Sequence, residues 1–397
     1  MLDESSLFHD LDLAALPGRR GVKWSKYPPD VLAAWVAEMD FPVAPVIRRA
    51  LHAAVERSDL GYPPEALASG LPTLFAERAQ RRWGWTLDPV LVQIIPDVIR
   101  GVELCIERFT NRGDAVLTTT PVYPPLLEVV STRGRVLADC PLTSDAHLDL
   151  DATAMMFAHH RPRLVVMCNP HNPTGRVFSY SELRGVAEIA LEHGAMLVSD
   201  EIHADLLFDG HHVPLASLGT DVEAKTITLT SASKAFNLAG LRAALMVAGS
   251  SKLAAMLSVG IEAIREPVSI MGLEASLAAW SPEGDEWLAA CLCVLDSNRQ
   301  LIAERLAAKV PSIGYSLPQA TYLAWLDCRS MGLGRSPAAW FLREAKVAVS
   351  CGARFGTPGK GFVRLNFGTS PTILRAMLDR IIAAAEQCGS STSKTCL

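Results

Sequence analysis

Residues 164–175 read LVVMCNPHNPTG, an apolar run that ends abruptly in a loop rich in proline and asparagine. The apolar residues of Leu164–Cys168 do not alternate with polar ones, which is typical of a strand buried on both faces. Met196–Ser199 has the same character. Such strands occur in parallel sheets that helices cover on both sides. The stretch therefore predicts an α/β fold around a mostly parallel sheet.

Helical and strand-like segments alternate from about Gly61 to Gly249, as in an α/β domain. Beyond residue 282 a long helix, three strand-like runs and a C-terminal helix predict a smaller α+β unit. We expect a large domain over 51–285 and a small domain over 286–397. The proline-broken segment 1–50 joins the small domain or reaches a partner subunit. The expected strands of the large domain are Val90–Ile95, Ala115–Thr119, Arg135–Ala138, Leu164–Cys168, Met196–Ser199, Thr226–Thr230 and Ala244–Val247, and its expected helices include Leu71–Trp83, Val98–Phe109, Pro124–Ser131 and Ser181–His193.

Composition excludes several classes of protein. Of the 397 residues, 49% are apolar and 20% are charged, and the net charge of −5 offers no basic surface for nucleic acid. No run of apolar residues is long enough to span a membrane. The nine cysteines are scattered, apart from Cys291 and Cys293, so neither a disulfide framework nor a zinc site is indicated. We expect a cytoplasmic protein without a metal.

Polar side chains follow three of the predicted strands. Asn172 comes after the first of them in the chain, Asp200 and His203 after the second, and Lys234 after the third. Ligands of open α/β sheets bind outside the carboxyl ends of the strands. Three polar groups at equivalent places therefore predict one shared site.

Lys234 and Asp200 suit a cofactor that carries an aldehyde and a pyridine ring. A desolvated amine can form a Schiff base, and an acidic partner keeps the ring nitrogen protonated. Ser231, Ser233 and Arg242 add hydroxyls and a guanidinium that suit a phosphate. Each residue alone has an ordinary explanation, as a helix cap, a turn residue or a surface ion pair. Together they predict pyridoxal 5′-phosphate (PLP).

Three motifs resemble those of one large superfamily. SASKAFNLAGLR, residues 231–242, resembles the lysine motif of the fold-type I PLP-dependent transferases, the aspartate aminotransferase superfamily. NPHNPTG (169–175) and SDEIH (199–203) resemble its asparagine and aspartate motifs. The resemblance implies a large domain with a mostly parallel seven-stranded sheet and a smaller α+β domain. The order of the matching residues is also that of the superfamily: Asn172, Asp200, Lys234, Arg242 and Arg364.

Further segments resemble the MalY/PatB branch of cystathionine β-lyases, or C–S lyases. His203 replaces the tyrosine common in aminotransferases, and Trp35–Phe41 and Tyr322–Asp327 resemble segments of that branch. The resemblance implies α,β-elimination from an S-substituted L-cysteine, with release of thiol, pyruvate and ammonia. An aminotransferase or a decarboxylating deaminase of a specialised biosynthetic pathway is the alternative with the same cofactor. A regulator without catalytic activity is the alternative from another class.

Residue roles follow from the same resemblance. The catalytic residues are Lys234, which forms the Schiff base and removes the substrate Cα proton, Asp200 at the pyridinium nitrogen, and Tyr123 stacked on the ring. Arg364 binds the substrate carboxylate. The functional unit is a homodimer with active sites shared across the interface. The remaining implied contacts are Asn172 and His203 at the phenolic oxygen, Ser231, Ser233, Arg242 and the amides of Val98 and Ile99 at the phosphate, Tyr62 at the neighbouring subunit's phosphate, and Trp24, Glu38, Asn172 and Tyr62 near the substrate.

Two positions depart from the family pattern. Asp97 stands where the family has a glycine-containing turn beside the cofactor phosphate, and a carboxylate there is electrostatically unfavourable. We expect Asp97 to cap the helix that starts at Val98 with its side chain turned away, while Arg100 supplies the compensating charge. Glu38 replaces a common aspartate close to the substrate side chain, which leaves open whether the substrate is cystathionine or a larger S-conjugate.

Overall fold

The computed structural model describes residues 6–259, 268–333 and 336–392. Within these ranges the chain divides into two compact units, which we describe separately. The larger unit consists of Val43–Asn172 and Arg176–Leu288. The smaller unit consists of Met1–Pro42, Pro173–Gly175 and Ala289–Leu397. No helix of the described residues combines the length and the apolar character that a membrane span requires.

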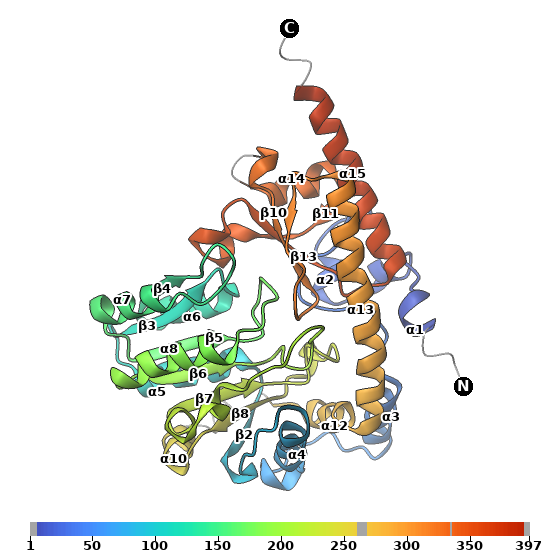
Figure 1. Ribbon diagram of the computed structural model, residues 1–397. Coiled ribbons are helices and arrows are strands. Elements are labelled where there is room, and N and C mark those ends of the chain that lie inside the picture. Colours follow the sequence, from blue (N-terminus) through green and yellow to red (C-terminus); the bar gives the residue numbers. More distant parts are fainter. Residues whose placement is uncertain (1–5, 260–267, 334–335, 393–397) are drawn as a thin grey trace. The chain divides into compact units, whose positions relative to one another are not determined.

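A seven-stranded sheet forms the centre of the larger unit (Figure 1). Side by side, its strands are β2 (Val92–Ile95), β8 (Ala244–Ala248), β7 (Thr226–Thr230), β6 (Met196–Asp200), β5 (Leu164–Cys168), β3 (Ala115–Thr120) and β4 (Val136–Pro141). The pairings from β7 across to β4 are all parallel, while β8 is antiparallel to both of its neighbours. The predicted mostly parallel seven-stranded sheet is confirmed.

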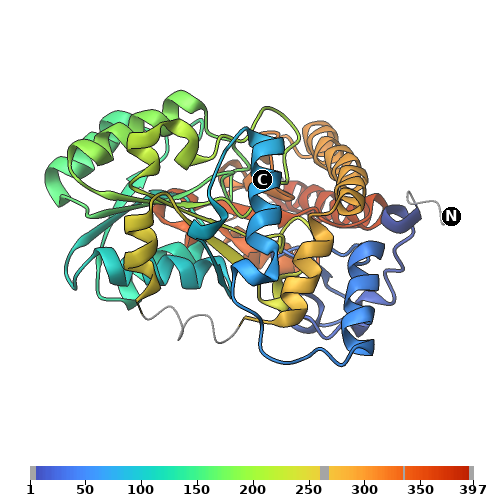
Figure 2. The ribbon, with the colours of Figure 1, turned by 90° about the horizontal axis from the view of Figure 1, so that it is seen from below.

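Helices cover both faces of this sheet (Figures 1 and 2). One face carries α5 (Val98–Phe109), α6 (Pro124–Thr132) and α10 (Ser251–Ser258), and the other carries α7 (Leu150–His160) and α8 (Tyr180–Glu192). Successive side chains of β5 alternate between the two layers: Val166 packs into the hydrophobic cluster beneath α5, and Val165 into the cluster beneath α8. Burial on both faces explains the unbroken apolar run of this strand.

Local signals fix where elements begin and end. Asp97 caps α5, and Ser179 caps α8 in a capping box with Glu182. Strand β2 begins two residues later than predicted, because a short 3₁₀ turn capped by Asp88 covers Pro89–Leu91. The other helices of the larger unit are α3 (Pro45–Glu56), α4 (Leu71–Trp83), α9 (Thr220–Glu223), α12 (Ile270–Ala279) and the first residues of α13 (Pro282–Lys309).

The smaller unit holds an antiparallel sheet and a short parallel pair. The sheet has the order β12 (Ser350–Cys351), β13 (Phe362–Asn366), β10 (Leu323–Asp327) and β9 (Gly314–Tyr315). Residues from the two ends of the chain meet in the pair of β1 (Leu32–Ala33) with β11 (Val347–Ala348). Its helices are α1 (Ser6–His9), α2 (Val22–Ser25), most of α13, α14 (Pro337–Glu344) and α15 (Pro371–Thr392).

Candidate active site

The predicted site residues of the larger unit follow strands that end at one edge of the sheet. Strands β3, β5, β6 and β7 are adjacent and parallel, so their carboxyl ends lie side by side. Tyr123 follows β3, Asn172 follows β5, Asp200 ends β6, and Lys234 follows β7. The fold thus gathers four residues that are far apart in the chain, at the edge where α/β sheets bind ligands.

The outer strands bring the predicted phosphate ligands to the same edge. Because β8 is antiparallel to both neighbours, β2 runs in the same direction as β7. Val98 and Ile99, which open α5 directly after β2, therefore lie at this edge. Arg242 lies two residues before β8. Because β8 is antiparallel to β7, its first residue, and Arg242 with it, lies at the same edge of the sheet.

Asp200 is the most perturbed acid of the site. Its side chain is buried, and burial raises its pKa from 3.8 to about 7. The backbone N–H of Ile202, which donates to Oδ1 at 3.1 Å, and the positive charge of Lys234 both act in the opposite direction. The neighbouring carboxylate of Glu201 adds to the rise. A buried carboxylate of this kind gains strongly from a cationic partner.

The loop that carries Lys234 is held by its own serines. Ser231 Oγ donates to the carbonyl of Ala243 at 2.7 Å and accepts from the backbone N–H of Ser233 at 3.0 Å. The single hydroxyl hydrogen of Ser231 is thus engaged within the loop. A contact of Ser231 or Ser233 with a phosphate stays a prediction.

Arg242 contacts Asp97, a partner that the sequence did not suggest. Its Nη1 donates to Asp97 Oδ2 at 2.6 Å, while Asp97 Oδ1 accepts the N–H of Arg100 at 2.9 Å. The predicted helix cap is present, but the Asp97 side chain is not turned away from the phosphate ligands. The predicted compensation by Arg100 is also wrong, because the Arg100 guanidinium pairs with Glu103. Arg242 itself neutralises Asp97.

The loop after β5, which contains Asn172, is closed by short hydrogen bonds. Asn169 Oδ1 accepts the backbone N–H of Phe178 at 3.0 Å, and the N–H of His171 donates to the carbonyl of Arg176 at 2.8 Å. Asn172 lies within the turn that these contacts close, and it is buried.

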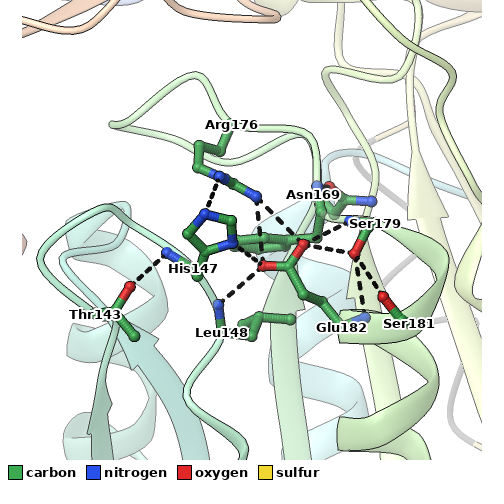
Figure 3. Close-up of polar contacts among 9 residues, drawn as sticks. Thr143, His147, Leu148, Asn169, Arg176, Ser179, Ser181 and Glu182 are labelled. Atoms are coloured by element: carbon green, nitrogen blue, oxygen red, sulfur yellow. Dashed lines mark hydrogen bonds and ion pairs between the residues drawn. The ribbon is translucent and has the colours of Figure 1, made fainter.

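A polar cluster anchors the far end of this loop (Figure 3). Arg176 donates to His147 Nε2 at 2.9 Å and to Glu182 Oε2 at 3.2 Å. Because a guanidinium can only donate, His147 accepts at Nε2 and donates from Nδ1 to Glu182 Oε1 at 3.0 Å. Glu182 also accepts the N–H groups of Leu148 and Ser179. This cluster was not predicted, although the S-x-x-E pattern of residues 179–182 is a signal for a capping box in the sequence.

A buried ion network supports the segment after β6, which carries His203. Arg78 of α4 is fully buried and donates to Asp205 Oδ1 at 2.9 Å and to Asp285 Oδ1 at 2.6 Å. Asp205 follows the buried His203 by two residues. This network was not predicted either, because no local sequence pattern links residues as far apart as Arg78, Asp205 and Asp285.

The two predicted tyrosines differ in exposure. Tyr123 precedes α6 and packs partly buried against the cluster beneath α5 and α6. Tyr62 exposes 92% of its surface.

Arg364, Trp24 and Glu38 belong to the smaller unit. The buried Arg364 donates from Nη2 to the carbonyl of Trp35 at 3.1 Å, and its guanidinium lies 4.9 Å from the ring centroid of Phe355. Trp24 is buried and donates from Nε1 to a neighbouring aspartate, Asp40, at 2.7 Å. Glu38 is half-buried, and its carbonyl accepts from two side chains.

Comparison with known proteins identifies the family. Residues 35–381 match the family model of the aminotransferases of class I and II. The chain belongs to this family. The aminotransferase-superfamily resemblance of the three motifs is thereby confirmed.

Full-length relatives of this family member place it in the C–S lyase branch. The cystathionine β-lyase of Corynebacterium glutamicum is 38% identical over 93% of this chain and 98% of that protein. The cystathionine β-lyase PatB of Bacillus subtilis is 32% identical over 92% of this chain and 97% of its own. The structure of the PLP-bound C–S lyase from Staphylococcus hominis matches with a TM-score of 0.88 at 26% identity, covering 94% of this chain and 99% of that one.

Proposed function

We propose that this protein is a PLP-dependent C–S β-lyase. It performs α,β-elimination on an S-substituted L-cysteine and releases a thiol, pyruvate and ammonia. The observation that carries the proposal is the buried carboxylate of Asp200, which lies within the electrostatic influence of Lys234 at the sheet edge. The names of the relatives in the C–S lyase branch support the same activity.

The residues at this edge fit PLP. Burial makes an isolated Asp200 carboxylate costly, and a protonated pyridine nitrogen is the cation that would relieve this cost. Lys234 supplies the amine, and the amides of Val98 and Ile99 open a twelve-residue helix whose N-terminus attracts a phosphate. When bound, PLP supplies an electron sink for the negative charge that develops at the substrate Cα.

The chain's own residues orient the substrate and move its proton. Lys234 is the base: its Nζ takes the Cα proton, and the electron pair left on Cα expels the thiolate from Cβ. Arg364 binds the substrate carboxylate with a planar fork, and its anchorage on the Trp35 carbonyl limits the directions that this fork can take. Since a thiolate is a good leaving group, orientation of the Cα–H bond is the main task of the site.

The activity is tested with a panel of S-substituted cysteines that includes cystathionine and larger conjugates, with products identified by mass. The wild-type protein should release thiol and pyruvate, and Lys234→Ala should lower that rate by at least about a thousandfold. Lys225→Ala, which changes an exposed lysine, is the control and should leave the rate unchanged. Undiminished release by the Lys234 variant would contradict the mechanism. Keto-acid-dependent amino transfer without thiol release would favour an aminotransferase instead.

We also propose that the protein is a cytoplasmic homodimer with shared active sites. Tyr62 is almost fully exposed, and the nearby Leu60 and Leu67 expose 59% and 51% of their surface, so three large apolar side chains of one segment face outward and support a subunit contact there. Seven of the nine cysteines have described side chains, and all seven are free thiols, which suits a reducing compartment: Cys105, Cys140, Cys168, Cys291, Cys293, Cys328 and Cys351.

A further inference from the structure

The ion pair between Asp97 and Arg242 joins two residues at the place where the proposed cofactor phosphate would bind. Arg242 has the left-handed backbone conformation, with φ 54° and ψ 65°. Residues other than glycine seldom adopt this conformation, and it recurs at functional sites. Arg242 adopts it two residues before β8 begins.

Asp97 uses both of its carboxylate oxygens. Oδ1 accepts the third amide of α5, from Arg100, and Oδ2 accepts from Arg242 Nη1 at 2.6 Å. The first two amides, those of Val98 and Ile99, are the ones left to an external anion. A negative charge thus already stands at the helix N-terminus, where the partial positive charge of the helix would otherwise attract the phosphate.

The geometry points to Asp97 as a built-in competitor of the cofactor phosphate for Arg242. This inference rests on the proposed function, because it takes PLP as the ligand. With Asp97 in place, a phosphate on the Val98 and Ile99 amides shares the Arg242 guanidinium with a carboxylate. A neutral residue at position 97 would leave all of that charge to the phosphate. Asp97 therefore weakens retention of PLP and makes the cofactor exchangeable.

The direct test is Asp97→Asn, measured on the full-length protein after removal of cofactor. Asparagine caps a helix as well as aspartate does, so α5 keeps its start. Because the pair is partly exposed, at 58% for Arg242 and 32% for Asp97, we expect PLP and inorganic phosphate to bind roughly three- to tenfold more tightly. Pyridoxal, which lacks the phosphate, should bind both proteins equally. The gain should shrink in 1 M salt, where charges are screened within about 3 Å.

Asp149→Asn is the matched control. Asp149 caps α7 through the third amide of that helix, from Ala152 at 2.8 Å, just as Asp97 caps α5. Among the described residues Asp149 forms no ion pair. This variant should lose the same charge at a helix N-terminus without any change in phosphate affinity.

Two outcomes would overturn the inference. Equal or weaker binding of PLP and phosphate by the Asp97 variant would show that the carboxylate positions Arg242 rather than competing for it. A gain that persists in an Arg242→Gln background would show direct repulsion of the phosphate instead of competition. If the wild-type protein binds PLP normally, either result leaves the proposed function standing. A wild-type protein that binds no PLP would overturn both proposals.

Discussion

Asp200 is buried, and burial opposes the ionisation of its carboxyl group. Burial raises its pKa to about 7, so the folded protein holds this proton more tightly than the unfolded chain does. The free energy of unfolding of the cofactor-free protein therefore falls as the pH rises from about 4 to about 7, and this contribution is constant above that range. The cost of the charge at pH 8 is of the order of 4 kcal/mol.

Removing the charge should stabilise the cofactor-free protein and impair the site. We expect Asp200→Asn, which keeps an acceptor for the Ile202 amide, to raise the free energy of unfolding at pH 8 by up to about 4 kcal/mol. Near pH 4 the difference should vanish. Urea unfolding at several pH values measures it, with Asp145→Asn in an exposed loop as the control. A pH-independent difference would contradict the raised pKa. The same variant should bind PLP more weakly.

The positions of site residues could be predicted from the sequence where the order and direction of the sheet strands alone determine them. Lys234 and Asp200 were placed correctly at one edge of the sheet, because polar residues after adjacent parallel strands must lie there. The partner of Arg242 could not be predicted in this way. One carboxylate oxygen of Asp97 caps the helix. The other accepts from Arg242, which is far along the chain and which no local pattern links to Asp97. The partner of Arg100 was not predicted either. Its guanidinium pairs with Glu103, one helical turn away, instead of compensating the charge of Asp97.

At the scale of elements, Arg78 ties α4 to the segment after β6 and to the start of α13. It is fully buried, and its charge is compensated by Asp205 and Asp285. Removing one member of a buried ion pair leaves an uncompensated charge, which typically costs 3–5 kcal/mol. We expect Arg78→Gln to lower the free energy of unfolding by about 3–5 kcal/mol. Arg81→Gln is the control, since Arg81 also contacts Asp285 but is half exposed, and it should cost less than about 1 kcal/mol. Equal effects in urea unfolding would contradict the role of the network.

The polar cluster of Figure 3 supports a second test at this scale. Burial opposes ionisation of Glu182, yet the hydrogen bonds from Ser179 and Leu148 and the charge of Arg176 lower its pKa overall. The ionised group therefore stabilises the fold above its ordinary pKa of 4.5, and this stabilisation is lost as the pH falls through the lowered value. We expect Glu182→Gln to cost about 1–2 kcal/mol at pH 7, and little once Glu182 of the wild-type protein is protonated.

Ser179→Ala removes the cap of α8 and also the hydrogen bond that the Ser179 hydroxyl donates to Glu182 Oε2 at 2.7 Å. It should therefore cost about 1 kcal/mol at pH 7 and less in acid, where the lost cap alone remains. Thermal unfolding of the two variants at pH 7 and in acid measures both penalties. A Glu182→Gln penalty that is the same at both pH values would show that packing, rather than charge, holds this cluster together.

Helices and strands were easier to predict where their burial leaves a clear apolar pattern in the sequence. Leu164–Cys168 was predicted to the residue, since a strand buried on both faces is a continuous apolar run bounded by polar loops. Thr226–Thr230 was also predicted to the residue, from its β-branched residues. Helix α7 was not predicted. Its only fully buried side chains are Thr153 and Phe157, so LDATAMMFAHH carries little of the period that marks an amphipathic helix.

At the scale of the whole molecule, contacts between the chain's two ends could not be derived from local pattern. Strand β1 consists of two residues, Leu32 and Ala33, and its partner β11 lies near the C-terminus. Two residues carry no periodicity, so only the inability of a proline-broken segment to fold alone suggested that it joins another part. The number of subunits cannot be predicted from a local pattern either, and the proposed homodimer stays a prediction.

Complementation between inactive variants tests the proposed shared sites. If Tyr62 serves the site of the neighbouring subunit, a Lys234→Ala subunit paired with a Tyr62→Ala subunit contains one complete site, with Lys234 from one chain and Tyr62 from the other. Random exchange makes half of the dimers mixed, and each has one intact site of two. Activity should therefore rise to about one quarter of the wild-type value.

The matched control mixes Lys234→Ala with Asp200→Asn. Both residues act within one subunit's site, because they interact across neighbouring strands of a single chain. Every site of such a mixed dimer lacks one of the two residues, so no activity should return. Size-exclusion chromatography of differently tagged variants verifies that the subunits have exchanged. Recovery in both mixtures would point to independent folding effects, and recovery in neither, with exchange verified, would place Tyr62 within its own subunit's site or outside the active site altogether.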